Sequence, residues 1–153
     1  MIDQKERRAI SRVSCLYGGM NVQVAVLCDA ATQDSNSKLN LLGAFDTILA
    51  AQLPAVQPQC AVALRATFTA DDEGPHKLAL NLINADGRSI MPPIEIPLMI
   101  RLPEDTHFLS LNFPINIQRL QFPAAGLYSV DIRLDGKSQA SIPLQVKLVQ
   151  RTA

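Results

Sequence analysis

The chain has 153 residues, the size of one ordinary domain, since independent domains cluster near roughly 100 to 150 residues. Fourteen Lys plus Arg balance fourteen Asp plus Glu, so the net charge is zero and nothing attracts a nucleic acid or an anionic membrane over long range. Apolar residues make up 48% of the chain and charged residues 18%, which excludes a disordered protein and predicts a charge-poor surface.

The cysteine content indicates a reducing compartment. Cys15, Cys28 and Cys60 are an odd number in a chain long enough to fold without disulfides, which is typical of free thiols. Residues 1–19 mix acidic and basic side chains and lack the apolar stretch of a signal peptide, and no apolar run could cross a bilayer of about 30 Å. We therefore expect a cytoplasmic protein with no membrane partner.

The composition changes at Met20, where a charge-rich leader gives way to apolar alternation. Residues 1–19 are expected to be an N-terminal extension that is either poorly ordered or a short helix, Gln4 to Val13, docked on the body or on a partner. Residues 20–153 contain no internal repeat and no long linker, so we expect one β-sandwich domain.

The apolar period after Met20 is two rather than 3.6, and Gly, Pro, Asp and Asn interrupt it every seven to ten residues or so, which is typical of antiparallel β-structure. The expected strands are residues 22–28, 39–48, 60–68, 77–82, 94–100, 109–117, 128–134 and 140–148. The pattern predicts an all-β fold: an antiparallel two-sheet sandwich of about eight strands, with immunoglobulin-like or similar Greek-key topology.

Three strands carry more specific expectations. Val22, Val24, Val26 and Cys28 are expected on one face of the first strand. Residues 39–48 are apolar on both faces and are therefore expected to be a central, doubly covered strand. The strand at 94–100 contains Pro97, which has no N–H for a ladder, so it is expected at a sheet edge.

The last two strands permit a parity argument. Opposed residues of a hairpin share a face, and both apolar sets are even-numbered, so paired residue numbers must add to an even value. A two-residue Asp135-Gly136 turn gives odd sums and is rejected. We expect a three-residue loop with Gly136 in a left-handed G1 bulge, Arg133 opposite Lys137, and Val130 opposite Ala140.

The segment before the seventh expected strand, residues 122–128, has the form of a corner. Pro123 and Gly126 turn the chain, and Tyr128 enters the core with a hydroxyl that needs a partner. This resembles the tyrosine corner of immunoglobulin-like sandwiches, although the chain has no Trp and lacks the Cys, Trp, Cys set of those domains.

Three motifs carry a resemblance to a known family. Residues 40–48 (NLLGAFDTI), 91–93 (MPP) and 126–136 (GLYSVDIRLDG) resemble an uncharacterised family of small bacterial proteins, over about residues 20–149. The resemblance implies a cytosolic, β-rich single domain with no assigned activity, and it transfers no catalytic residue. Residues 1–19 depart from the family pattern.

Acidic and histidine residues offer a limited set of ligands for a metal. Asp71 and Asp72 lie in one acidic run, and Glu104, Asp105 and His107 lie in another, so loop folding could gather them around calcium or zinc. The spacing is that of neither an EF-hand nor a CxxC, HxH or HExxH site, so hairpin turns are the favoured interpretation and no metal or other cofactor is expected.

Other catalytic signatures are missing from the sequence. There is no GxSxG, GxxxxGK[ST] or GxGxxG motif, and the basic residues are dispersed with few aromatics, which argues against nucleic-acid binding. Cys28 and Cys60 are expected to pack in the core, with a thiol nucleophile or a redox pair as the alternatives.

The function expected from these observations is a non-catalytic protein-interaction module that binds protein partners or itself through an edge strand or an apolar sheet face. Ile94, Ile96 and Leu98 are the candidate interface residues. One alternative is a small cytosolic metal-dependent enzyme or ion-binding domain using the acidic loops, and another is a carrier of a small apolar ligand between the sheets. The apolar segment 49–56 either crosses between sheets and covers the sandwich end or contributes to an interface.

Overall fold

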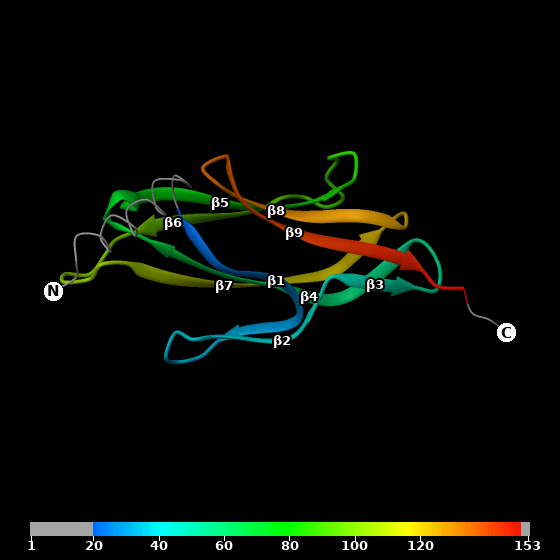
Figure 1. The fold of residues 1–153 in the computed structure, drawn as a ribbon, viewed down its shortest axis with the longest axis horizontal. Helices are drawn as coiled ribbons and strands as arrows, with labels where there is room; N and C mark the ends of the chain where they lie inside the picture. The colour runs from blue at the N-terminus through cyan, green and yellow to red at the C-terminus, as the bar shows by residue number, and fades with distance from the viewer. Residues whose placement is uncertain (1–19, 151–153) are drawn as a thin grey trace, which may run out of the picture.

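The alternating segments build nine strands in two sheets packed face to face (Figure 1). The computed structural model describes residues 20–150. One sheet has the order β2 (Leu39–Phe45), β1 (Asn21–Gln33), β4 (Ala55–Phe68), β7 (Leu109–Phe122). The other has the order β3 (Thr47–Ala50), β9 (Lys137–Leu148), β8 (Gly126–Leu134), β5 (Gly74–Asn84), β6 (Ile94–Ile100), and a 3-10 turn, η1 (Ala70–Asp72), precedes β5. The predicted all-β sandwich is confirmed.

The main core lies between the two sheets and is built from alternate residues of the central strands. Val62 and Leu64 of β4, Leu80 of β5, Ile132 of β8 and Leu144 of β9 are all at most 2% exposed. Every second residue of these strands points inward, as the period of two predicted. Val130 and Ile142, on which that interpretation depends, are also buried in this core.

The strand order is immunoglobulin-like. β9, β8, β5 and β6 lie in the order of strands G, F, C and C′, and β1, β4 and β7 lie in the order of A, B and E. Tyr128, at the start of β8, donates its hydroxyl proton to the carbonyl oxygen of Ala124 at 2.6 Å, so the predicted tyrosine corner is present. The Tyr128 ring also meets the Phe122 ring edge-on, with centroids 5.0 Å apart.

The predicted second strand, residues 39–48, is wrong as a single central strand. It divides at Asp46 into β2, the edge of the four-stranded sheet, and β3, the edge of the other. β3 runs parallel to β9, so the fold also departs from a purely antiparallel arrangement and has nine strands instead of about eight. Leu42 on β2 is 73% exposed, because the second apolar face of this segment has no sheet over it.

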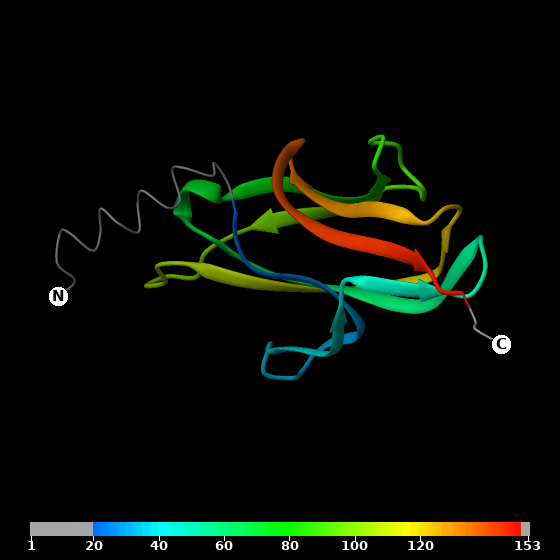
Figure 2. The same ribbon diagram turned by 45° about the vertical axis from the view of Figure 1, so that its right-hand side comes forward.

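The β1–β2 hairpin folds back over the outer face of its own sheet, where Figures 1 and 2 show it below β1 and β4. Its apolar side packs on Ala61 and Ala63 of β4, which are fully buried, and forms a second small core with Cys28. The side-chain amide of Asn112, on β7, donates to the carbonyl oxygen of Ser37 in the hairpin turn at 2.7 Å. We refer to residues 30–42 as the arm.

The predicted common face of Val22, Val24, Val26 and Cys28 is also wrong. A register shift between Val22 and Val24 changes the parity of β1. Val22 therefore packs against the main core, whereas Val26 and Cys28 pack beneath the arm. A β-bulge inserts one extra residue and moves all later side chains to the opposite face.

The β8–β9 hairpin corrects the parity argument in one respect. Ile132 opposes Ala140 and Val130 opposes Ile142, so the predicted even sums hold along the body of the hairpin. The turn, however, is the rejected two-residue Asp135-Gly136 turn, with Leu134 opposite Lys137 and both turn residues at positive φ. The register shift that restores parity lies one pair away from the turn: Arg133 opposes Ser138 but Ile132 opposes Ala140, so the extra residue is Gln139 on β9 and not Gly136.

Two of the prolines within strands occupy edge strands, whereas Pro58, Pro75 and Pro143 lie in strands that have a neighbour on each side. Pro97 lies in β6, which is an edge strand as predicted, and Pro114 lies in β7, the edge of the other sheet. A proline there leaves the ladder intact because its missing donor can face the open side. Segment 49–56 does cross from one sheet to the other, between β3 and β4, with Leu49 68% and Val56 50% exposed. Within residues 20–150, no helix has the length and hydropathy needed to cross a membrane.

Candidate functional site

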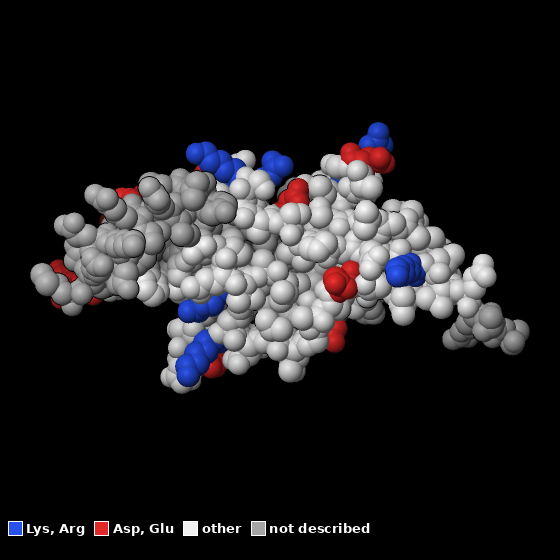
Figure 3. All heavy atoms as spheres, in the orientation of Figure 1, with Lys and Arg blue, Asp and Glu red and all other residues white. Residues whose placement is uncertain are grey.

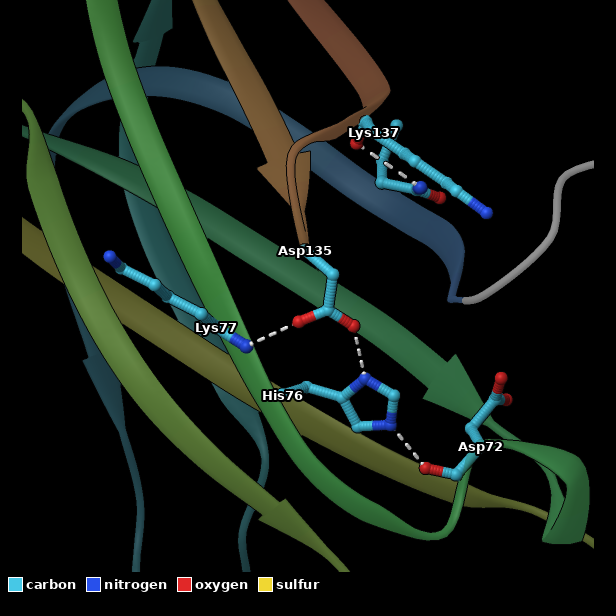
Figure 4. Close-up of polar contacts among 6 residues, drawn as sticks. Asp72, His76, Lys77, Asp135 and Lys137 are labelled. Atoms are coloured by element: carbon cyan, nitrogen blue, oxygen red, sulfur yellow. Dashed lines mark hydrogen bonds and ion pairs between the residues drawn. The ribbon is translucent and has the colours of Figure 1, made fainter.

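His76 makes a polar contact with each of its two ring nitrogens (Figure 4). It lies near the start of β5, and its Nδ1 is 2.6 Å from Oδ2 of Asp135 in the β8–β9 turn. Its Nε2 meets the backbone carbonyl oxygen of Asp72 in η1. The second oxygen of Asp135 accepts the backbone N–H of Lys77 at 2.9 Å. The imidazole therefore joins η1, β5 and the turn.

The surroundings of His76 favour its charged form. Both of its partners are acceptors, and only an imidazolium can donate from both ring nitrogens. The hydrogen bond to Asp135, reinforced by the Asp72 carbonyl, outweighs partial burial and raises the pKa of His76 above its usual value. The same hydrogen bond lowers the pKa of the Asp135 carboxyl. Both shifts favour the ion pair and widen the range of pH over which both partners are charged.

This arrangement is suited to holding the loops together. A general base or a metal ligand needs a free nitrogen lone pair, and both nitrogens of His76 are engaged by acceptors. Neither neighbour is a nucleophile that the imidazole could activate. Sequence reasoning did not single out this pair, because Asp135 approaches His76 only through the β5–β8 pairing, in which Leu78 opposes Leu134.

The two acidic loops meet at one end of the sandwich, but their carboxylates serve local purposes. Asp72 is 8% exposed, and its Oδ2 accepts the Thr69 backbone N–H at 2.8 Å as part of a capping box at η1. Glu73 accepts the backbone N–H of Leu102, which ties this loop to the one after β6. Asp71 is exposed on η1 and makes none of these contacts.

Glu104, Asp105 and His107 lie in the exposed loop between β6 and β7. Asp105 adopts a positive φ of 59°, as expected of a turn residue. Within residues 20–150, no group of three or more His, Cys, Asp or Glu side chains lies close enough to hold a metal ion. The five residues predicted as a polar cluster are therefore not assembled into a metal centre by the described chain.

The two described cysteines are free and buried, one in each core. Cys28 donates its thiol to the Ala61 carbonyl oxygen at 3.5 Å beneath the arm. Cys60 faces the main core, where burial raises its pKa to about 11. Burial also raises the pKa of Cys28. A thiol with a raised pKa is a poor nucleophile at neutral pH, so this environment favours core packing over catalysis.

The main core has a lateral opening at each side of the sandwich. β1 and β9 lie beside each other at one lateral opening, where Ala25, Leu27 and Ile142 line a hollow of 320 Å³. At the opposite side, β6 and β7 end their respective sheets. Their inward residues touch the main core but remain half-buried: Ile94, Ile96, Leu98, Leu109, Leu111, Phe113 and Ile115. We define these seven residues as the β6–β7 seam.

The seam contains all three predicted interface residues. Ile94, Ile96 and Leu98 do lie on an edge strand, but they point inward and pack against the core. The outward residues of β6 are exposed: Glu95, Pro97 and Met99, the last at 56%. Phe108, immediately before β7, is 58% exposed. The accessible apolar surface at this side therefore comes from the sandwich opening as well as from the strand itself.

Two further surfaces bear on the other hypotheses. A shallow hollow of 570 Å³ lies on the outer face of the five-stranded sheet, lined in part by Leu127, Ser129 and Pro143. The lateral hollow beside β1 and β9 is mostly apolar, and Asp46 is one of its lining residues. If the chain were a carrier of a small apolar ligand, this hollow is where the ligand would bind. In the face drawn in Figure 3, charged side chains are few and scattered, as the composition predicted.

Comparison with known proteins identifies the family of this chain. No curated protein matches the sequence. An alkylpurine DNA glycosylase from Pseudomonas fluorescens, solved bound to DNA with an abasic-site analogue, is 9% identical with a TM-score of 0.39. That match covers 92% of this chain and 34% of the glycosylase, so the chain spans about a third of its length.

An immunoglobulin-like protein from Pseudomonas aeruginosa is similar at 10% identity and a TM-score of 0.36, covering 86% of this chain and 98% of that protein. A family model described as a family of unknown function (DUF6941) matches residues 23–147. That range takes in both long sequence motifs and every strand of the two sheets, in full or in large part. The chain belongs to this family.

Proposed function

We propose that this chain is a non-catalytic protein-interaction module that binds protein through the β6–β7 seam. The observation that carries the proposal is the gradient of burial across the core. Leu64 and Ile132 on central strands are fully buried, whereas inward residues of β6 and β7, such as Ile96 and Leu111, are not. A row of half-buried apolar residues beside two free strand edges is the surface that strand addition uses.

A partner that covered the seam would complete the burial of its apolar side chains, and this burial would favour binding. Fully burying a Leu, Ile or Phe side chain contributes roughly 1.5–3 kcal/mol relative to leaving it exposed. The seven side chains of the seam are only half-buried, so part of this free energy is gained when a partner covers them. Phe108 and Met99 extend the same surface and are more than half exposed.

The polar features support this function over the enzymatic alternative. Both ring nitrogens of His76 contact acceptors that join loops of the fold, and the Asp72 side chain caps η1. The carboxylates of the acidic loops are divided among loop contacts and exposed positions, so a catalytic assignment has less to support it. We place the activity in the cytoplasm, which the two free thiols of the described residues support.

Site-specific photo-crosslinking in the cells of origin tests the proposal. A photo-reactive benzoyl-phenylalanine in place of Phe108 samples the seam side with little change of shape. The matched control carries it in place of Leu127, which is 66% exposed on the outer face of β8. Protein adducts at position 108 and none at 127 are expected. Equal adducts at both positions, or none at 108, would refute the proposed surface.

A further inference from the structure

β7 has the longest unpaired edge in the described part of the chain. It runs 14 residues, Leu109–Phe122, pairs with β4 at both ends and everywhere between except at Arg119, and has no strand on its other side within residues 20–150. β6, the facing edge, has only seven residues and carries Pro97 at its centre. A long row of backbone donors and acceptors at an edge is completed best by another β-strand.

The strand that would fit this edge has a definite pattern. It needs apolar side chains at alternate positions, so that its inward row continues the seam, and polar residues between them. β7 itself has this pattern. Five alternate residues of the strand are apolar and belong to or contact the main core: Leu109, Leu111, Phe113, Ile115 and Ile117. Its alternate residues Ser110, Asn112, Asn116 and Gln118 are polar. The edge is therefore complementary to a second copy of itself.

The charges at the two ends of β7 select the direction of pairing. Exposed Glu104 and Asp105 precede the strand, and exposed Arg119 lies near its other end. A parallel pair would place Arg119 beside Arg119. An antiparallel pair centred near Pro114 brings each Arg119 toward the acidic loop of the other copy, and it also confines the missing donors of the two prolines to the middle.

We propose that two copies of this chain associate through β7, antiparallel across a two-fold axis, so that their four-stranded sheets join edge to edge. This inference rests on the proposed function and names the partner of the same surface. Pairing brings Leu111 and Phe113 of one β7 strand beside Ile117 and Ile115 of the other, which covers the β7 half of each seam. It is an isologous contact, in which each charge pair occurs twice.

Light scattering coupled to size-exclusion chromatography tests the association with the full chain as the probe. We expect twice the mass of one chain at high concentration and dissociation on dilution. Arg119→Glu should weaken the dimer about tenfold or more, because it sets like charges together at both symmetry-related contacts. The matched control is Arg133→Glu, which makes the same change of net charge on an exposed residue of β8 and should leave the dimer unchanged.

Charge exchange makes the test independent of folding defects. Glu104→Arg alone should also weaken association, and the double variant R119E/E104R should restore it, since it rebuilds the same pairs in reverse. Failure of the double variant to recover, with both single variants weakened, would overturn the antiparallel register. An unaltered dimer in R119E would likewise overturn it.

Amide hydrogen exchange distinguishes this inference from the proposed function. A β7 dimer should slow exchange within residues 109–118 as concentration rises, with residues 94–100 of β6 unaffected. A chain that stays monomeric up to about 1 mM overturns the second copy as partner. If position 108 nevertheless crosslinks to other proteins, the proposed function stands. If crosslinking and dimerisation both fail, both proposals fall.

Discussion

The Nδ1 atom of His76 lies 2.6 Å from the Oδ2 atom of Asp135, although 59 positions separate the two residues in the chain. The pair ties the start of β5 to the β8–β9 turn, and its strength depends on pH with a sign that follows from the two pKa shifts. His76 has a raised pKa, so its contribution is complete below the unfolded value of about 6.5 and is lost as the pH rises through the folded pKa.

The carboxyl group of Asp135 sets the low-pH limit of the stabilisation that the pair provides. Its pKa is lowered, so its contribution is present above about 3.9 and is lost as the pH falls through the folded value. We therefore expect His76→Gln to cost about 0.5–1 kcal/mol near pH 5.5 and less near pH 9, the modest value reflecting the partial exposure of Asp135. Urea unfolding at both pH values measures it, and an equal loss at the two would contradict the ion-pair account.

The β8–β9 hairpin shows how far sequence reasoning extends in this protein. Parity alone gave the correct facing of Val130 and Ile142, because one misplaced row would put several apolar residues in water. Parity could not locate the bulge, because a bulge in the turn and a bulge one pair away from the turn give the same facing in the rest of the hairpin. The two-residue turn places Asp135 where its carboxylate contacts His76 and the backbone N–H of Lys77. These contacts join neighbouring strands of the sheet, so no local sequence pattern reveals them.

Gly43, on β2, should be the least replaceable of the described glycines. Its φ is +68°, and a Cβ there would lie 2.3 Å from the Asp29 carboxylate on β1. The matched control is Gly87, which also has positive φ, +78°, but open space around its Cβ position. Gly87→Ala should cost about 1–2 kcal/mol, the usual strain of a left-handed residue, and Gly43→Ala clearly more.

Thermal unfolding of both glycine variants measures the difference. Adding Asp29→Ala to Gly43→Ala should recover the part of the loss due to the clash and leave the part due to φ. Equal losses in Gly43→Ala and Gly87→Ala would show that the Asp29 side chain moves aside to admit the methyl group.

The tyrosine corner should contribute measurably to stability. Tyr128→Phe removes the hydroxyl that donates to the Ala124 carbonyl at 2.6 Å and retains the edge-on contact with Phe122. We expect a loss of about 1 kcal/mol, the net value of one hydrogen bond. Chemical denaturation measures it. Tyr128→Leu, which also removes the aromatic contact, should cost more, and a neutral Tyr128→Phe would show that the corner is held by packing alone.

The seam was partly visible in the sequence and partly not. Pro97 marked β6 as an edge, so Ile94, Ile96 and Leu98 were correctly placed on an edge strand. Their inward direction and the second half of the seam, on β7, depend on which strand faces which across the sandwich. The sequence also did not reveal that strand 39–48 divides at Asp46, where the backbone passes from one sheet to the other. Apolar residues on both faces do not reveal such a crossing, because a central strand has the same pattern.

The two buried thiols should be nearly inert in the native protein, for reasons that differ between them. Cys60 lies in the main core with a pKa of about 11, so its thiolate is scarce at pH 8 and its sulfur is inaccessible. Cys28 is covered only by the arm, which is held in part by the Asn112 to Ser37 contact. In a Cys15→Ser background, iodoacetamide at pH 8 should therefore modify Cys28 slowly and Cys60 more slowly still. Asn112→Ala should accelerate modification at Cys28 several-fold without changing Cys60, as peptide mapping of the alkylated sites would show. Parallel acceleration at both thiols would mean that the arm opens only when the whole sandwich unfolds.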